Sequence, residues 1–107
     1  GLILCVGALE EAHHLALSVA GVHVKVVDVL PAELPASFDA LLLTEPTVDL
    51  VTSLSPKLPV IVRLTSTDID ELSQMLRAGA SEAIPQKSSP TDLVRKVSRV
   101  LRRRRRS

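Results

Sequence analysis

Five short apolar runs, separated by segments with helical spacing, constrain the fold of this 107-residue chain more than any other feature. Most of the runs are rich in valine, leucine and isoleucine at successive positions, which is typical of strands buried on both faces of a parallel sheet. The second run alternates apolar with charged residues, so we expect it at an edge of the sheet. The runs are 2–6, 22–29, 40–43, 58–64 and 82–84.

Three of the segments between and after these runs have apolar residues spaced by three or four positions, as amphipathic helices do. Two other connections, 30–38 and 45–57, are short and contain prolines. We therefore expect shortened helices there, with about one turn in the first of them. The predicted core-facing residues are Leu9, Ala12, Ala16, Val19 and Ala20 in the first helix, Ile69, Leu72, Met75 and Leu76 in the next, and Leu93, Val97, Val100 and Leu101 in the last.

Capping signals mark the start of two of these helices. Thr67 and Asp70 have the spacing of a capping box, with aspartate in place of glutamate. Ser89 precedes Pro90 and Asp92, which suits an N-cap followed by proline and an acid in the first turn. The repeated order of strand and helix predicts an α/β fold with a parallel sheet and right-handed crossovers.

Composition narrows the class of protein. Hydrophobic residues make up 46% of the chain, yet there is one Phe and no Trp or Tyr, so the core must be aliphatic. The single cysteine, Cys5, excludes an intrachain disulfide and a cysteine-based metal site, and it suits a reducing cytoplasm. No apolar run reaches the ~18–20 residues that span a membrane. We expect a cytoplasmic protein with no signal peptide and no membrane partner.

Charge is distributed unevenly along the chain. Residues 1–101 hold eight basic and 12 acidic residues, a net charge of −4, and Arg102–Arg106 add five positive charges. We predict one domain over 1–101, with 102–107 as a basic helix end or a linker to a following domain. The arginines favour a helix C-terminus. Without aromatic residues for stacking, we expect DNA to be bound only through a possible downstream domain.

The stretch 76–93, LRAGASEAIPQKSSPTDL, closely resembles the corresponding part of response-regulator receiver domains, most of all the branch that precedes a LuxR-type helix-turn-helix. Phe38–Thr44 resembles the third-strand signature of that family, and Leu58–Val62 resembles its fourth strand. The resemblance implies a flavodoxin-like (CheY-like) three-layer sandwich, with a five-stranded parallel sheet in the order 2-1-3-4-5.

The same resemblance indicates that the phosphotransfer site is degenerate. The family holds a metal ion with an acidic pair and an acceptor aspartate, and it binds the phosphate with a lysine and a Ser or Thr. Here Gly7 and Ala8 stand at the acidic pair, Thr44 at the acceptor, and Gln86, followed by Lys87, at the lysine. The switch hydroxyl falls on Thr65, although counting back from Gly79 gives Leu64. Glu10 and Glu11 follow the acidic-pair positions but are expected on the solvent face of the first helix.

Other polar residues offer no second site. His13 and His14 diverge by about 100° on a helix and His23 lies on a strand, so we expect structural or surface roles and no metal. We expect Cys5 to be an inert buried thiol. Arg63 stands unexplained in an apolar strand, where it either reaches the end of the strand or contacts a partner.

The sequence therefore favours a non-phosphorylatable receiver-like signalling domain, neither an enzyme nor a cofactor protein, within a bacterial response regulator that controls transcription. We expect a protein partner or a homodimer through the face formed by the family's fourth helix, fifth strand and fifth helix. The alternative is a small flavodoxin-like nucleotide- or ligand-binding protein, although Val6–Leu9 has one glycine where a phosphate loop needs several. The predicted dimer face contains Glu71, Arg77, Asp92, Arg95, Lys96 and Arg99.

Overall fold

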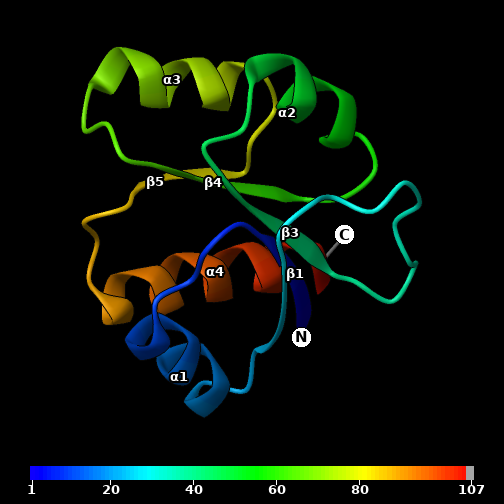
Figure 1. Cartoon of the computed structure of the whole chain (residues 1–107), viewed down its shortest axis with the longest axis vertical. Coiled ribbons are helices and arrows are strands. Elements are labelled where there is room, and N and C mark those ends of the chain that lie inside the picture. The colour runs from blue at the N-terminus through cyan, green and yellow to red at the C-terminus, as the bar shows by residue number, and fades with distance from the viewer. Residues whose placement is uncertain (106–107) are drawn as a thin grey trace.

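The computed structural model describes residues 1–105, and they form a five-stranded parallel sheet between two pairs of helices (Figure 1). The strand order is β2-β1-β3-β4-β5, as the resemblance implies, and the alternating strand lies at an edge as predicted. The strands are β1 (Leu2–Val6), β2 (His23–Val27), β3 (Ala40–Thr44), β4 (Val60–Leu64) and β5 (Glu82–Pro85). The helices are α1 (Glu11–Val19), α2 (Val48–Leu54), α3 (Ile69–Arg77) and α4 (Pro90–Arg105).

Each face of the sheet has its own apolar core. Alternate residues of a strand point to opposite faces, so that Ile3 and Cys5 pack toward α1 and α4 whereas Leu4 packs toward α2 and α3 (Figure 1). Strands β3 and β4 are buried along nearly their whole length. Both cores are mainly aliphatic, as the composition requires. The sheet and the pair of helices on each of its faces form a three-layer α/β sandwich.

The connection between β2 and β3 differs from the expectation. We predicted about one helical turn there, but residues 28–39 contain no helix. Two prolines, Pro31 and Pro35, interrupt a segment that has little room for a helix. The shortened helix predicted after β3 is confirmed as the seven-residue α2. The described part of the chain therefore has four helices where five were expected.

The predicted buried face of the first helix is wrong in part: Leu9 packs against the core and Ala16 is half-buried, but the other predicted residues are exposed. Val19 is 81% exposed and Ala12 is exposed, whereas His13 and Leu17 are buried. Alanines contribute little apolar area, so burial of the larger Leu17 decides which side of the helix faces the sheet. His13, four residues earlier, shares that face. An imidazole is buried there because its ring is hydrogen-bonded, as described below.

Helix α3 also differs from its predicted pattern. Met75 is buried and Leu72 is partly buried, but Ile69 is 76% exposed and Leu76 is exposed too. The N-cap is Asp68, whose carboxylate accepts a hydrogen bond of 2.9 Å from the Asp70 N–H, so the capping box from Thr67 is not formed. Residue 70 takes part in this bond through its backbone N–H, and the Asp70 side chain completes no capping box with Thr67.

The predictions for α4 are confirmed. The Asp92 N–H donates a hydrogen bond of 3.1 Å to the Ser89 hydroxyl, and all four predicted core residues are buried. The helix continues through Arg105, so most of the arginine run is helical. Arg106 and Ser107, which belong to the predicted basic end, lie outside the described residues. No described helix combines the length and apolar character of a membrane span.

Candidate functional site

The carboxyl ends of the parallel strands bring the predicted site positions to one edge of the sheet. Gly7 and Ala8 follow β1, Thr44 ends β3, and Gln86 follows β5. In the register of β3 and β4, Thr44 lies opposite Arg63. Open α/β sheets place their ligand sites at this edge.

Gly7 and Thr44 lie directly against each other. Gly7 has φ +111°, and a Cβ atom there would lie 2.8 Å from the Thr44 Cβ and 3.0 Å from its hydroxyl oxygen. The Gly7 N–H donates a hydrogen bond of 2.9 Å to the Val27 carbonyl, which anchors this turn to β2. The Thr44 hydroxyl is buried and has no hydrogen-bond partner among residues 1–105. Thr44, the predicted acceptor position, thus lies against Gly7, the first of the two predicted acid positions.

Arg63 is the largest side chain in the interior and is only 1% exposed. Its guanidinium donates two hydrogen bonds to the two carboxylate oxygens of Glu10, at 3.0 and 2.9 Å, and a third of 3.4 Å to the Gln86 carbonyl. Fork-to-fork pairing of this kind is the strongest geometry for an arginine and a carboxylate. It ties β4 to the start of α1 and to the segment after β5.

Glu10 therefore does not lie on the solvent face of α1, as we predicted. It is the N-cap residue, with extended backbone (φ −62°, ψ 145°), and its carboxylate turns back toward the sheet. Glu11, one residue later, is exposed as expected. The signal for the pair was present in the sequence, because an arginine in an apolar strand requires a carboxylate partner. Which of the chain's acids supplies it depends on the tertiary structure.

His13 extends this network along α1. Its Nε2 lies 2.9 Å from the Ser88 carbonyl oxygen, so this nitrogen carries the proton and donates, and its Nδ1 lies 3.4 Å from a Glu10 carboxylate oxygen. The chain of contacts from Arg63 through Glu10 and His13 to Ser88 connects β4, α1 and the segment before α4. His13 thus has a structural role, as predicted.

The buried network and the core shift two pKa values in opposite directions. The hydrogen bond from Arg63 lowers the pKa of Glu10 from 4.5 to about 2, with the positive charge of Arg63 acting in the same direction. Burial raises the pKa of the Cys5 thiol to about 11. Since the thiolate is the reactive form, Cys5 is an inert core thiol, as expected.

Glu45 closes the edge between β3 and β4. It adopts a left-handed backbone (φ 53°), its N–H donates to the Arg63 carbonyl at 2.8 Å, and its carboxylate accepts from the Thr65 N–H. Leu64 is the buried last residue of β4, and Thr65 is the first exposed residue after it. Glu45 therefore satisfies one backbone acceptor and one backbone donor at this edge, and Thr65 as a switch hydroxyl stays a prediction.

The segment after β5 carries no lysine into the site. The Gln86 N–H donates a hydrogen bond of 2.7 Å to the Leu64 carbonyl, and the Gln86 Oε1 atom is buried without a partner among the described residues. Lys87 is exposed. Arg63, from β4, is a buried cation at this edge, and no group of three or more metal-binding side chains occurs within residues 1–105.

The predicted dimer face lies on α3, β5 and α4, and several of its charges are paired within the chain. Asp92 pairs with Arg95 and, at 3.2 Å, with Lys96, and these two cations lower the pKa of its carboxyl group. Arg99 lies 3.2 Å from Glu82. Glu71 and Arg77 are exposed on α3. This face presents charges of both signs.

Acid titration tests the pair of Arg63 and Glu10. The pKa of Glu10 is lowered in the folded protein, so its contribution to stability is fully present above pH 4.5 and is lost as the pH falls toward 2. We expect wild type and Glu10→Gln to differ in free energy of unfolding at pH 6 and to converge near pH 2, as measured by urea unfolding. Glu11→Gln is the matched control. Parallel curves for wild type and Glu10→Gln would contradict this assignment.

No protein-family model matches the chain, and no curated protein matches it significantly. Solved structures do match. A response regulator from Thermotoga maritima is 18% identical, with a TM-score of 0.79 over 94% of this chain and 97% of that one. A response regulator receiver protein from Pseudoalteromonas atlantica is 18% identical, with a TM-score of 0.77 over 95% and 98%.

The chain has the CheY-like receiver fold. A CheY-like receiver domain protein from Methanospirillum hungatei agrees, at 20% identity and a TM-score of 0.75 over 98% of this chain and 96% of that one. At these identities the likeness establishes the fold, and it confirms the five-stranded topology predicted from the resemblance. The LuxR-type branch and the loss of the phosphoacceptor remain predictions.

Proposed function

We propose that this chain is a receiver-like signalling domain that is not phosphorylated and acts through protein contacts. The observation that carries the proposal is the close packing of Gly7 against Thr44 at the acceptor position. A phosphoryl group on a receiver needs an acceptor carboxylate and carboxylate ligands for a divalent cation. Gly7, Ala8 and Thr44 supply neither.

The ion pair of Arg63 and Glu10 supports the same proposal. Both oxygens of the Glu10 carboxylate are bound by the guanidinium, so this acid is committed to an internal partner and is a poor metal ligand. The positive charge of Arg63 is likewise balanced inside the chain. We infer that the ion pair of Arg63 and Glu10 holds the carboxyl edge of the sheet in one arrangement, and that phosphate and metal have no part in this.

We propose that the domain transmits its signal by binding a protein partner or a second copy of itself through the face of α3, β5 and α4. Glu71 and Arg77 have opposite charge on the exposed side of α3, and such surfaces pair well across a two-fold axis. As part of a response regulator, the domain would control transcription through a DNA-binding domain elsewhere in the protein. The alternative, ligand binding at the carboxyl edge, is disfavoured because Gly7 and Thr44 leave no room between them.

Titration with a phosphate analogue tests the proposal. We expect beryllium fluoride with Mg²⁺, added to ¹⁵N-labelled protein, to cause no saturable shift of the Gly7 and Thr44 amide signals in NMR spectra. Thr44→Asp is expected to stay unresponsive, because it restores the acceptor without the acidic pair. A phosphorylatable receiver serves as positive control. Saturable shifts around Gly7 and Thr44 in the wild-type chain would refute the proposal.

A further inference from the structure

A hollow lies between the loop that joins β2 to β3 and the end of α2, at the edge of the sheet opposite to Gly7 and Thr44. Residues 30–36 of the loop form one wall, and Leu54 and the segment that follows α2 form the other. The loop, drawn in cyan, projects at one side of the molecule (Figure 1). The hollow has a volume of about 600 Å³, within the range of about 300–1,000 Å³ that is typical of small-molecule sites.

Two leucines hold the loop wall in place. Leu30 and Leu34 are half-buried and pack against the core on the α2 side of the sheet. Pro31 and Pro35 follow directly after these two anchors, and each proline fixes one backbone torsion. The wall is therefore largely ordered before a ligand binds, which lowers the entropic cost of binding.

Apart from three charged residues, the lining consists of leucine, proline and alanine side chains. Leu54 and Leu58 are buried and close the floor of the hollow. The surface that a ligand can cover comes from the loop, where Pro31 and Pro35 are exposed and the two leucines are half-buried. Such a surface favours a ligand with an aliphatic body.

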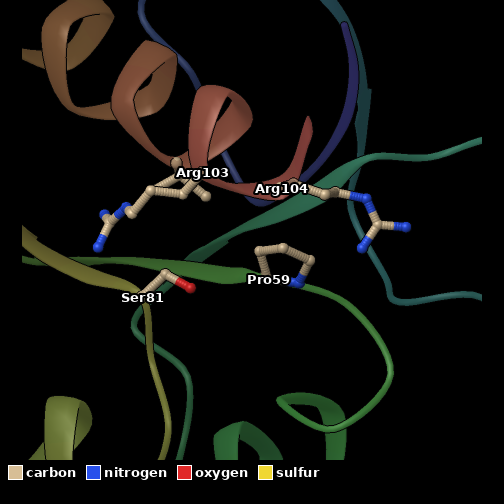
Figure 2. Close-up of a pocket in the computed structure, with 5 residues that line it drawn as sticks. Pro59, Ser81, Arg103 and Arg104 are labelled. Carbon is tan, nitrogen blue, oxygen red and sulfur yellow. The ribbon is translucent and has the colours of Figure 1, made fainter. Parts of the chain in front are cut away.

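The charged residues at the hollow are Glu33, Lys57 and Arg104. All three are exposed, and none forms an ion pair with another described residue. Figure 2 looks into the neighbouring pocket at Pro59 and shows the Arg104 side chain extended away from Arg103. Two cations from different elements, against one acid, make the hollow complementary to a ligand with a single negative charge.

We propose that this hollow binds a small aliphatic carboxylate of medium chain length. The chain would cover the leucines and prolines of the loop wall, and the carboxylate would lie between Lys57 and Arg104. A single negative charge is favoured over several, because Glu33 balances one of the two cations. The site is independent of the proposed function, since it uses none of the residues at the carboxyl edge.

The test uses the 107-residue chain, ¹⁵N-labelled and titrated with octanoate below the concentration at which octanoate forms micelles. Saturable shifts of the Leu34, Lys57 and Arg104 amide signals are expected in NMR spectra. Octan-1-ol has the same chain without the charge, and acetate has the charge without the chain. Each should bind about tenfold more weakly than octanoate.

The double variant Lys57→Gln/Arg104→Gln should weaken the binding of octanoate about tenfold, because exposed ion pairs contribute a factor of about three each. Lys25→Gln/Arg102→Gln is the matched control, since it removes the same charge from exposed residues that do not line the hollow. It should bind octanoate as the wild type does. Dispersed spectra of both variants verify that they are folded.

Four results would overturn the proposal. These are no saturable shift in the wild type, equal loss of affinity in the control variant, binding of octan-1-ol as tight as that of octanoate, and binding of acetate as tight as that of octanoate. Saturable shifts of Gly7 and Thr44 in place of the loop signals would place the ligand at the carboxyl edge, and would count against the proposed function as well.

Discussion

Replacing Glu10 with alanine is expected to lower the free energy of unfolding by about 3 kcal/mol, because it leaves a buried guanidinium without its carboxylate. Arg63 is 1% exposed, and after the substitution its remaining side-chain hydrogen bond within residues 1–105 would be the one of 3.4 Å to the Gln86 carbonyl. Removal of one member of a buried pair costs about 3–5 kcal/mol. We expect the lower end of this range, because the Glu10 side chain is 43% exposed and water reaches this side of the pair.

Arg63→Met is the complementary substitution, because it removes the other member of the ion pair. It removes the buried charge and leaves Glu10, which water can solvate, so the expected loss is below about 1.5 kcal/mol. Adding Arg63→Met to Glu10→Ala should therefore restore about 2 kcal/mol of stability. Urea unfolding of the four proteins completes the cycle. Strictly additive losses, or a costlier change at Arg63 than at Glu10, would show that the pair is not what holds this edge together.

Gly7→Ala is expected to destabilise the protein by about 3–5 kcal/mol, for two separate reasons. A side chain at φ +111° is strained in any surroundings, and the new Cβ would lie 2.8 Å from the Thr44 Cβ. Neither the anchored turn after β1 nor the end of β3 has room to yield, since both belong to the paired sheet. Thermal and urea unfolding measure the effect.

Gly21→Ala measures the cost of backbone strain at positive φ without a steric clash. Gly21 also has positive φ (+85°), but nothing lies within 4 Å of the position that its Cβ would occupy. Its substitution should cost only about 1–2 kcal/mol, the backbone strain alone. Thr44→Gly, combined with Gly7→Ala, should recover part of the loss. If the two alanine variants are equally stable, Gly7 and Thr44 are not in the close contact from which the inactive site is inferred.

The strand order and the layers of the fold could be predicted from the sequence, although the helix expected between β2 and β3 is absent from the described residues. The apolar runs predict buried strands because both faces of a parallel sheet are covered, and the segment 76–93 predicts the family fold. The core face of α4 was also predictable, since Leu93, Val97 and Val100 are large residues at one helical spacing. In each case the pattern lies within one continuous stretch of chain, where periodicity and local capping suffice.

The contacts at the carboxyl edge of the sheet, by contrast, could not be predicted from the sequence. Arg63 and Glu10 are 53 residues apart, and no local pattern selects Glu10 over the other acids of the chain. The orientation of α1 was likewise settled by burial of Leu17 and by the bond from His13 to Ser88, against the alanine pattern. Periodicity describes one element at a time. A buried charge or a close contact between two strand ends depends on which elements the fold places side by side.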